Sequence, residues 1–378
     1  MRRKQIAIVL QTVNGCRRPI VLGVSRYTAQ RADWSLRWCF VDRSPLDEGY
    51  LSNVDGILCV TEDPAWAESV FNRSRPVVLA GCRPLAADHG AVFCDPEKTG
   101  ALAAQHLHQS GHDHLACLYQ QGELGESLRR GFVEQARRQE VEAKVLCLPA
   151  TSDEMNNGFQ ATISDWLLKL PRPTGLFVSC DRWGANLCEL ARESHIVVPE
   201  DLAVIAPGND LDIASMSRPA LSIVEQPCEN IGLQAAALLA DMLGGGTSRH
   251  VALSPQQVLR CASTDSLATA DVNVRQAVEY IRQNAHRPIG VRDVLKSVHS
   301  SRRALEQRFR RALRRTIMEE IRRTRFELAS SFLAKGSLPI SQVALQCGLG
   351  SSAHLNQLTR RYTGLSPREV RQRARLES

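Results

Sequence analysis

Two short stretches in the last quarter of the sequence contain side chains whose polar groups match the edges of DNA bases. The candidates for base contacts are Arg303, Glu306, Gln307, Ser352, Asn356 and Gln357. A guanidinium can donate two hydrogen bonds to guanine, a carboxylate can accept one from cytosine, and a carboxamide can pair with adenine. Neighbouring arginines are better placed for backbone phosphates: Arg302, Arg310, Arg311, Arg360 and Arg361.

The second stretch is predicted to be the recognition helix of a helix-turn-helix motif. A short helix that begins at Ile340 has its apolar residues on one face, and Gly348 ends it. After a turn, Ser351 or Ser352 is a suitable N-cap for a helix whose leucines face inward. The outward face of that helix is polar and basic, as DNA recognition requires.

The first stretch belongs to an earlier pair of helices. The pattern predicts helices over Val291–Val298 and Arg302–Leu313, with Ser300 or Ser301 as the N-cap of the second. A long helix over Ile317–Lys335 would then join the two motifs. Two recognition helices on a rigid connector can enter successive major grooves, roughly 34 Å apart on one side of a duplex. The connector's own arginines are expected only to keep it soluble: Arg322, Arg323 and Arg325.

Charge is divided unevenly along the chain. Residues 271–378 contain 22 Lys and Arg against 9 Asp and Glu, a net charge of +13, whereas the first 270 residues carry −6, for a total of +7. A basic module behind a mildly acidic body is typical of a nucleic-acid-binding domain fused to another domain. The small, polar segment 261–270 between them has the composition of a linker.

The body is predicted to be a two-lobed α/β domain. Short apolar runs alternate with amphipathic stretches up to about residue 260, which favours parallel sheets with helices on both faces. The expected strands are 6–10, 36–41, 56–60, 77–80, 115–119, 144–148, 175–179 and 202–206. Two such sets of about equal size would form two lobes, with a ligand cleft at the carboxyl ends of the strands.

The C-terminal motifs resemble those of the AraC/XylS family of transcription regulators. The matching residues are Ile340, Val343, Ala344, Gly348, Leu355, Arg360, Gly364, Ser366, Pro367 and Arg371, and segment 301–310 resembles the family's first recognition helix. The sequence departs from the family where His354, Leu355, Thr359 and Val370 replace aromatic residues, which predicts a less bulky core and an unaffected outward face. Arg314 stands where the family usually has Gly, which costs about 1 kcal/mol if a left-handed turn is kept there.

The body resembles the periplasmic-binding-protein-like effector domain of LacI/GalR regulators. Asp95, Thr99-Gly100-Ala101, His106-Leu107 and Gly111-His112 match one part of that domain, and segments 196–205 and 220–227 match two others. An AraC-type module behind such a domain resembles the xylose-operon regulator family. The resemblance implies a cytoplasmic homodimer that binds operator DNA, a small sugar and RNA polymerase, and that acts as an activator.

Ligand residues transfer from this resemblance only in part. The family's sugar-contacting Arg and Asp fall at Leu128 and Gly208, and each loss removes charge-assisted hydrogen bonds worth about 1.5–3 kcal/mol. The resemblance still places Asp181 and Gln226 in the cleft. The full candidate set for a sugar is Asn14, Asp181, Trp183, Asn209, Asp210 and Gln226. Asp181 is equally suited to be a helix N-cap, and Trp183 could be a core residue instead of stacking on a sugar face.

Other classes of function are disfavoured. The histidines at 106, 108, 112 and 114 lack a Cys or carboxylate at ligand spacing other than Asp113, so no metal site is predicted. No catalytic constellation or phosphate loop stands out, so we expect neither an enzyme nor a cofactor. No apolar run approaches the roughly 20 residues that a membrane helix needs. The 12 cysteines are scattered and often sit in apolar runs (Cys39, Cys59, Cys117 and Cys147), which indicates buried reduced thiols.

The sequence therefore predicts a ligand-responsive, sequence-specific DNA-binding transcription regulator of sugar-utilisation genes, with a small sugar such as a pentose as the ligand. The predicted divisions are an effector-binding domain over 1–262, a linker over 263–270 and a DNA-binding domain over 271–378, with helix-turn-helix motifs near 291–313 and 340–363. The alternative is a sugar-binding or sugar-modifying α/β protein whose basic tail binds nucleic acid incidentally.

Overall fold

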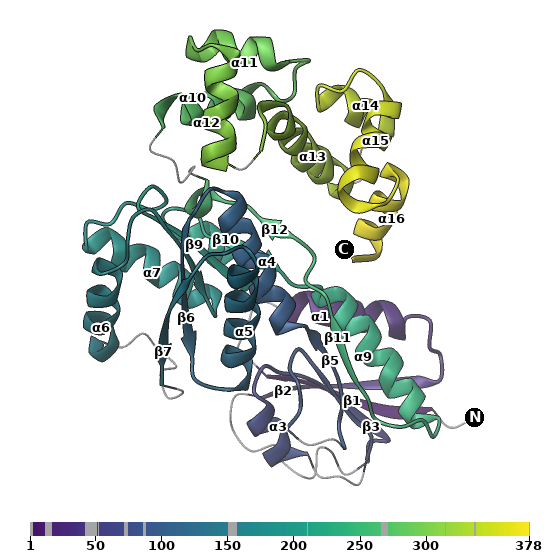
Figure 1. Ribbon diagram of the computed structural model, residues 1–378. Helices are drawn as coiled ribbons and strands as arrows, with labels where there is room; N and C mark the ends of the chain where they lie inside the picture. The colour runs from purple at the N-terminus through teal and green to yellow at the C-terminus, as the bar shows by residue number, and fades with distance from the viewer. Residues whose placement is uncertain are drawn as a thin grey trace. The chain divides into compact units, whose positions relative to one another are not determined.

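The alternating apolar and amphipathic segments form two six-stranded sheets, followed by a helical region, in the computed structural model (Figure 1). The structure describes residues 3–11, 17–41, 51, 53–71, 75–85, 88–149, 157–209, 211–265, 271–313, 315–335 and 338–377. The chain divides into two compact units. One comprises Met1–His108 and Asp113–Ser266, and the other comprises Gln109–His112 and Leu267–Ser378.

The first lobe is built on a parallel sheet in the order β11-β5-β4-β3-β1-β2. Its strands are β1 (Lys4–Gln11), β2 (Trp34–Val41), β3 (Gly56–Val60), β4 (Val77–Ala80), β5 (Gly90–Cys94) and β11 (His250–Leu253). Helices α1 (Arg17–Thr28) and α9 (Cys228–Leu243) cover one face, and α3 (Pro64–Val70) packs on the other. A Cβ at Gly23 would lie 1.9 Å from the Glu229 carbonyl oxygen, so α1 and α9 approach each other backbone to backbone.

The second lobe has a sheet in the order β12-β10-β9-β8-β6-β7, parallel except for β12. Its strands are β6 (His114–Gln120), β7 (Ala143–Leu148), β8 (Thr174–Val178), β9 (Leu202–Gly208), β10 (Ser222–Glu225) and β12 (Val258–Leu259). One face packs against α4 (Pro96–Gln109) and α5 (Glu123–Arg138). The other packs against α6 (Asn157–Leu168) and α7 (Asp181–Glu193), and the short α8 (Leu211–Met216) follows β9.

Three chain crossings join the lobes. The chain passes from β5 to α4, returns from β10 to α9, and crosses again from β11 to β12. Backbone hydrogen bonds tie the crossings side by side: Asp95 N–H donates to the Leu253 carbonyl at 2.7 Å, and Gln256 N–H donates to the Glu225 carbonyl at 2.9 Å. The two-lobed α/β architecture with helices on both sheet faces is confirmed.

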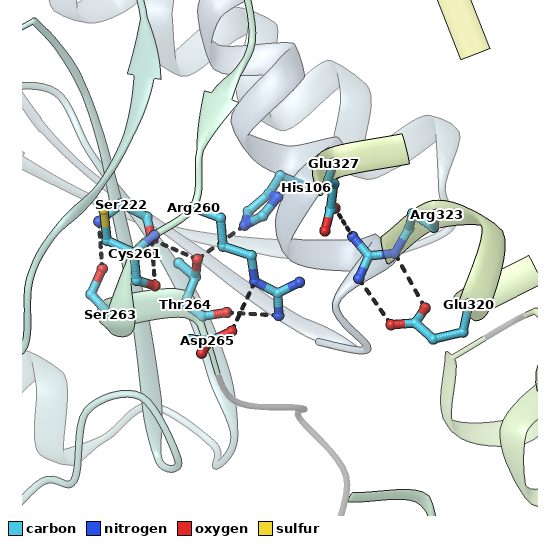
Figure 2. Close-up of polar contacts among 10 residues, drawn as sticks. All are labelled: His106, Ser222, Arg260, Cys261, Ser263, Thr264, Asp265, Glu320, Arg323 and Glu327. Carbon is cyan, nitrogen blue, oxygen red and sulfur yellow. Dashed lines mark hydrogen bonds and ion pairs between the residues drawn. The ribbon is translucent and has the colours of Figure 1, made fainter. Parts of the chain in front are cut away.

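A buried polar cluster attaches the end of the effector domain to the second lobe (Figure 2). The short 3₁₀ turn Ala262–Thr264 contains two fully buried hydroxyl residues, Ser263 and Thr264. The Ser263 hydroxyl donates to the Val204 carbonyl at 2.6 Å. Thr264 Oγ1 lies 2.7 Å from Ser222 Oγ and 3.1 Å from His106 Nε2. The segment immediately before residues 266–270 is therefore fixed to β9, β10 and α4.

The second unit contains seven helices among its described residues: α10 (Val272–Asn284), α11 (Val291–Val298), α12 (Arg302–Leu313), α13 (Ile317–Lys335), α14 (Ile340–Gln346), α15 (Ser352–Thr363) and α16 (Pro367–Glu377). Helices α10 to α12 share one hydrophobic core, and α14 to α16 pack around another. Helix α13 contributes to both, with Ile317 and Ile321 in the first core and Ala329 and Leu333 in the second.

Several elements were not expected from the sequence. They are β5, β10, β11, β12, α3, α8 and α16, most of which are short. The cysteine prediction holds for Cys39, Cys59 and Cys117, which are buried free thiols, but it is wrong for Cys147, which is exposed on the edge strand β7.

The expectation that Arg323 serves only solubility is also wrong. Its side chain is 19% exposed and pairs with Glu320, which is fully buried, and with Glu327 (Figure 2). Arg315, 13% exposed, pairs with the same Glu320 carboxylate. Burial alone would raise the pKa of Glu320, but the guanidinium groups of Arg323 and Arg315 lower it to about 2. A buried carboxylate is thus held ionised between two cations.

Replacing Glu320 with Ala should destabilise α13 strongly. The change leaves two largely buried guanidinium groups without their shared partner, which typically costs about 3–5 kcal/mol. We expect amide hydrogen exchange in α13 of the full chain to become roughly 100-fold faster or more. Glu327→Ala is the matched control, because the Glu327 side chain is 45% exposed and its loss should cost less than about 1 kcal/mol.

The same carboxylate gives a pH dependence. Because the pKa of Glu320 falls from 4.5 to about 2 in the folded protein, its contribution to stability is present above pH ~4.5 and is lost as the pH falls toward 2. Glu320→Gln should therefore reduce the pH dependence of exchange in α13 within this window. An unchanged profile would contradict the assignment.

Candidate nucleic-acid interface and ligand cleft

The first recognition helix is α12. The Ser301 hydroxyl accepts a hydrogen bond from Ala304 N–H at 3.3 Å, so Ser301 caps the helix and Ser300 does not. Leu305 and Phe309 are fully buried, which turns the opposite face outward. The predicted DNA contacts Arg302, Arg303, Gln307 and Arg310 are all exposed on that face.

Glu306 differs from its neighbours on α12. Its side chain is half-buried, and Oε2 is shielded from solvent without a hydrogen-bond partner among the described residues. An ionised oxygen without a donor is costly to bury. A base that donates a hydrogen bond, such as cytosine, would satisfy this oxygen, but its shielding makes Glu306 less accessible than Arg303.

The second recognition helix is α15, and Ser351 is its N-cap, with Oγ accepting from His354 N–H at 3.3 Å. Leu355 and Leu358 face the core. Four predicted DNA contacts are exposed on this helix: Ser352, Gln357, Arg360 and Arg361. Thr359, where the resemblance expects Phe, is fully buried, and its hydroxyl donates to the Asn356 carbonyl at 3.2 Å.

Asn356 lies in the wall of a groove beside α15. The groove has a volume of about 470 Å³ and is lined by Ile340, Ser341, Ser352, Asn356, Ser366, Pro367 and Arg368. It lies where the N-terminal ends of α14, α15 and α16 meet. Sequence reasoning missed Ser341 and Arg368, because their proximity to Asn356 depends on how α14 and α16 pack and α16 was not predicted.

The carboxyl ends of the second-lobe strands place a carboxylate at the expected cleft. Asp181 follows β8, and its Oδ1 accepts from Arg182 N–H at 2.8 Å. The N-cap of α7 is Cys180, so the alternative N-cap assignment for Asp181 is wrong. A Cβ at Gly208 would lie 2.5 Å from Asp181 Oδ2. The glycine that replaces the expected family Asp therefore makes room for the Asp181 carboxylate.

Asn209 holds the second crossing instead of facing the cleft freely. Its Nδ2 donates to the Gln226 carbonyl at 2.8 Å, and its Oδ1 accepts from Gln226 N–H at 2.7 Å. Both hydrogen-bonding ends of the carboxamide are thereby used by one backbone unit. Asn209 joins the end of β9 to the crossing between β10 and α9, and it positions Gln226.

The structure supports a cleft role for none of the remaining candidates that it describes. Trp183 is only 5% exposed and packs in the second-lobe core, which supports its role as a core residue. Leu128, at the position of the expected family Arg, is 2% exposed in the other core of that lobe, so nothing polar replaces the Arg there. Its neighbour Arg129 pairs with Glu126 at 2.9 Å. Asn14, Asp210 and Arg314 lie outside the described residues.

The first lobe contributes polar groups that sequence reasoning missed. Gln11 ends β1 and Thr61 follows β3, and the Thr61 hydroxyl donates to Gln11 Oε1. Both side chains are at least 95% buried. The Gln11 amide nitrogen is buried without a partner among the described residues. A polar residue directly after a wholly apolar strand was the signal that could have identified this pair.

Glu62, next to Thr61, faces the second lobe. Its side chain is exposed to solvent at the surface of the lobe, and the protein around its carboxyl group raises the pKa of Glu62 to about 7 by desolvation. The Asp181 carboxylate raises this pKa further, whereas Arg182 lowers it. The carboxyl ends of the two sheets thus present hydrogen-bonding groups toward one another.

Comparison with protein families assigns both units. Residues 104–264 match a periplasmic binding protein-like domain, and residues 294–373 match a helix-turn-helix domain. The xylose operon regulatory protein of Escherichia coli K12 is 27% identical over 384 aligned residues, which cover 98% of this chain and 97% of that protein. The corresponding protein of Haemophilus influenzae is also 27% identical, with 97% and 98% coverage.

A solved structure gives the same arrangement of domains. The structure of the xylose-binding transcription activator xylR aligns over 98% of both chains with a TM-score of 0.62 and 25% identity. The chain is thus similar to this xylose-operon type of regulator over nearly its whole length. A LacI transcriptional regulator from a Rhodococcus species aligns over 70% of this chain and 100% of its own, with a TM-score of 0.59 and 19% identity. This likeness shows the fold of the effector domain.

The two domain matches and the regulators aligned over nearly the whole chain indicate a sugar-responsive, DNA-binding transcription regulator rather than an enzyme. Among the described residues, no helix is long and apolar enough to cross a membrane. The sugar-contacting residues that the resemblance implies are replaced at two positions of this chain, Leu128 and Gly208.

Removing the Asn209 carboxamide should loosen the second crossing. Asn209→Ala abolishes two hydrogen bonds to Gln226, each worth about 0.5–1.5 kcal/mol, so exchange of the Gln226 amide should accelerate roughly 5- to 100-fold. Hydrogen-exchange mass spectrometry of the full chain measures this directly. Asn186→Ala, an exposed change on α7, is the control. Equal exchange in both variants would show that Asn209 does not hold the crossing.

Proposed function

We propose that this regulator controls sugar-utilisation genes by coupling sugar binding between its lobes to operator binding by α12 and α15. The observation that supports this most directly is the pair of outward faces, each rich in exposed arginine and carboxamide groups, on two helix-turn-helix motifs of one basic unit. Arg303, Gln307, Asn356 and Gln357 would contact bases. Arg302, Arg310, Arg360 and Arg361 would contact phosphates.

We place the ligand between the carboxyl ends of the two sheets. Gln11, Thr61 and Glu62 from the first lobe and Asp181 and Gln226 from the second offer donors and acceptors suited to hydroxyl groups. A pentose is the preferred candidate, because the related regulators are named for xylose. Closure of the lobes on a sugar would favour one arrangement of paired DNA-binding units in a homodimer, so sugar and operator affinities are reciprocally coupled. By analogy with the xylose-binding activator, we propose recruitment of RNA polymerase.

A ligand screen tests the cleft. Thermal-shift measurements against pentoses, hexoses and their acids identify the sugar that stabilises the full chain. Asp181→Asn should then reduce the affinity for that sugar roughly 10- to 100-fold, because charge-assisted hydrogen bonds to hydroxyls are worth about 1.5–3 kcal/mol. Asp165→Asn, on the exposed face of α6 in the same lobe, should leave the affinity unchanged. Equal affinities in the two variants would remove Asp181 from the site.

Two arginine variants test how DNA is read. Arg303→Ala should relax the sequence preference at one position of a selected duplex, with a loss of about 1–3 kcal/mol for the preferred base. Arg360→Ala should reduce the affinity for all duplexes by the same factor and should also reduce the salt dependence of binding. Binding to randomised duplexes at fixed salt measures both effects. Equal affinity of the unaltered protein for every duplex would favour the alternative of an incidental nucleic-acid-binding tail.

A further inference from the structure

The two helix-turn-helix motifs have separate cores, so their relative orientation needs an explanation. Helix α13 is the only described element buried in both cores. A single helix fixes the distance between two motifs, at about 1.5 Å per residue, better than it fixes their rotation about its axis. A second contact between the motifs is therefore needed to hold both recognition helices in one geometry.

Arg325 of α13 makes such a contact with the loop between α10 and α11. Its Nη2 donates to the carbonyl oxygens of Arg287 at 2.8 Å and Ile289 at 3.0 Å, and its Nε donates to that of Ala285 at 3.3 Å. These three carbonyls belong to the C-cap of α10 and the loop after it, where the regular hydrogen bonding of the helix has ended. The planar guanidinium, with donors in a fixed fork, can reach all three together.

Gly348 of the second motif contacts the same loop. It lies in the turn between α14 and α15 with φ +63°, and a Cβ there would be 2.3 Å from the Arg287 carbonyl oxygen and 2.6 Å from that of Ala285. Gly348 was expected only to end a helix, but it also lets the turn touch the first motif. Burial raises the pKa of the adjacent Cys347 thiol to about 12, and the nearby Arg325 guanidinium partly opposes this rise.

The loop 285–289 is thus held by Arg325 and contacted by the turn that leads directly into α15. On the other side, the same loop leads directly into α11 of the first motif. We infer that Arg325 and Gly348 are positioning residues that fix the orientation of α12 relative to α15, and thereby set the spacing between the two DNA elements that the regulator accepts. This inference rests on the proposed reading of one duplex by both helices.

The spacing of the DNA elements provides the test. The duplex is first obtained by selection with the full-length protein, and base pairs are then inserted between its two elements. An insertion of two base pairs rotates one element by roughly 70° relative to the other. Because two linked sites gain from a matched geometry, the unaltered protein should lose affinity about tenfold or more on this insertion.

Arg325→Ala should reduce this penalty to less than about threefold, while binding to duplexes that carry only one element stays within about twofold of the unaltered protein. Gly348→Ala should give the same result independently, because the added methyl group forces the turn between α14 and α15 away from the loop 285–289. Arg325→Lys should restore little, because an ammonium lacks the fork. Arg322→Ala is the matched control, because Arg322 is exposed on the same helix.

The outcomes are distinguishable. If the unaltered protein shows no spacing preference, the proposed reading of one duplex by two helices fails. If that preference exists and Arg325→Ala and Gly348→Ala retain it, this inference alone fails. Loss of binding to single-element duplexes by both variants would show that the contact is required for folding of a motif, which also overturns the positioning role.

Discussion

The DNA-binding unit depends on the burial of one helix in two hydrophobic cores. Helix α13 supplies Ile317 and Ile321 to the first and Ala329 and Leu333 to the second. Two of its less exposed charged residues are paired within the unit: Glu320 lies between two guanidinium groups, and Arg325 donates to three carbonyl oxygens. The ion pairs specify which faces of α13 turn toward each core, because an unpaired buried charge would oppose any other rotation.

In the effector domain, two hydrogen bonds between the Asn209 carboxamide and the Gln226 backbone hold one of the chain crossings. Parallel sheets bring polar residues at their carboxyl ends together without any specific interaction, because the strands all end at one edge. The crossings, by contrast, are irregular segments that need their own hydrogen bonds. Asn209 therefore has a structural partner where the sequence suggested a sugar, and Asp181 occupies the space that Gly208 leaves open.

The sequence predicted long, strongly patterned elements well. Helices α11, α12 and α13 begin and end at the predicted residues, because apolar periodicity defines them locally and the Ser301 cap marks the start of α12. Strands β10 and β12 were missed because they have only four and two residues, and α16 because its pattern is mostly basic.

The candidate site was predictable only where a side chain's role follows from its own helix. The exposed faces of α12 and α15 are of this kind. The burial of Trp183, the occupied carboxamide of Asn209 and the contact of Gly348 with residues 285 and 287 depend on partners far away in the sequence. The spacing of residues along one element does not contain that information.

The attachment of Thr264 has a mechanical consequence for the regulator. Its hydroxyl is held by Ser222 and His106, and Ser263 is bonded to Val204, so all of its anchors belong to the second lobe. A hinge rotation of that lobe about the three crossings must displace the start of the linker by the same rotation. The first lobe can bend away without pulling on the linker directly. The start of the linker therefore follows the position of the second lobe and not that of the first.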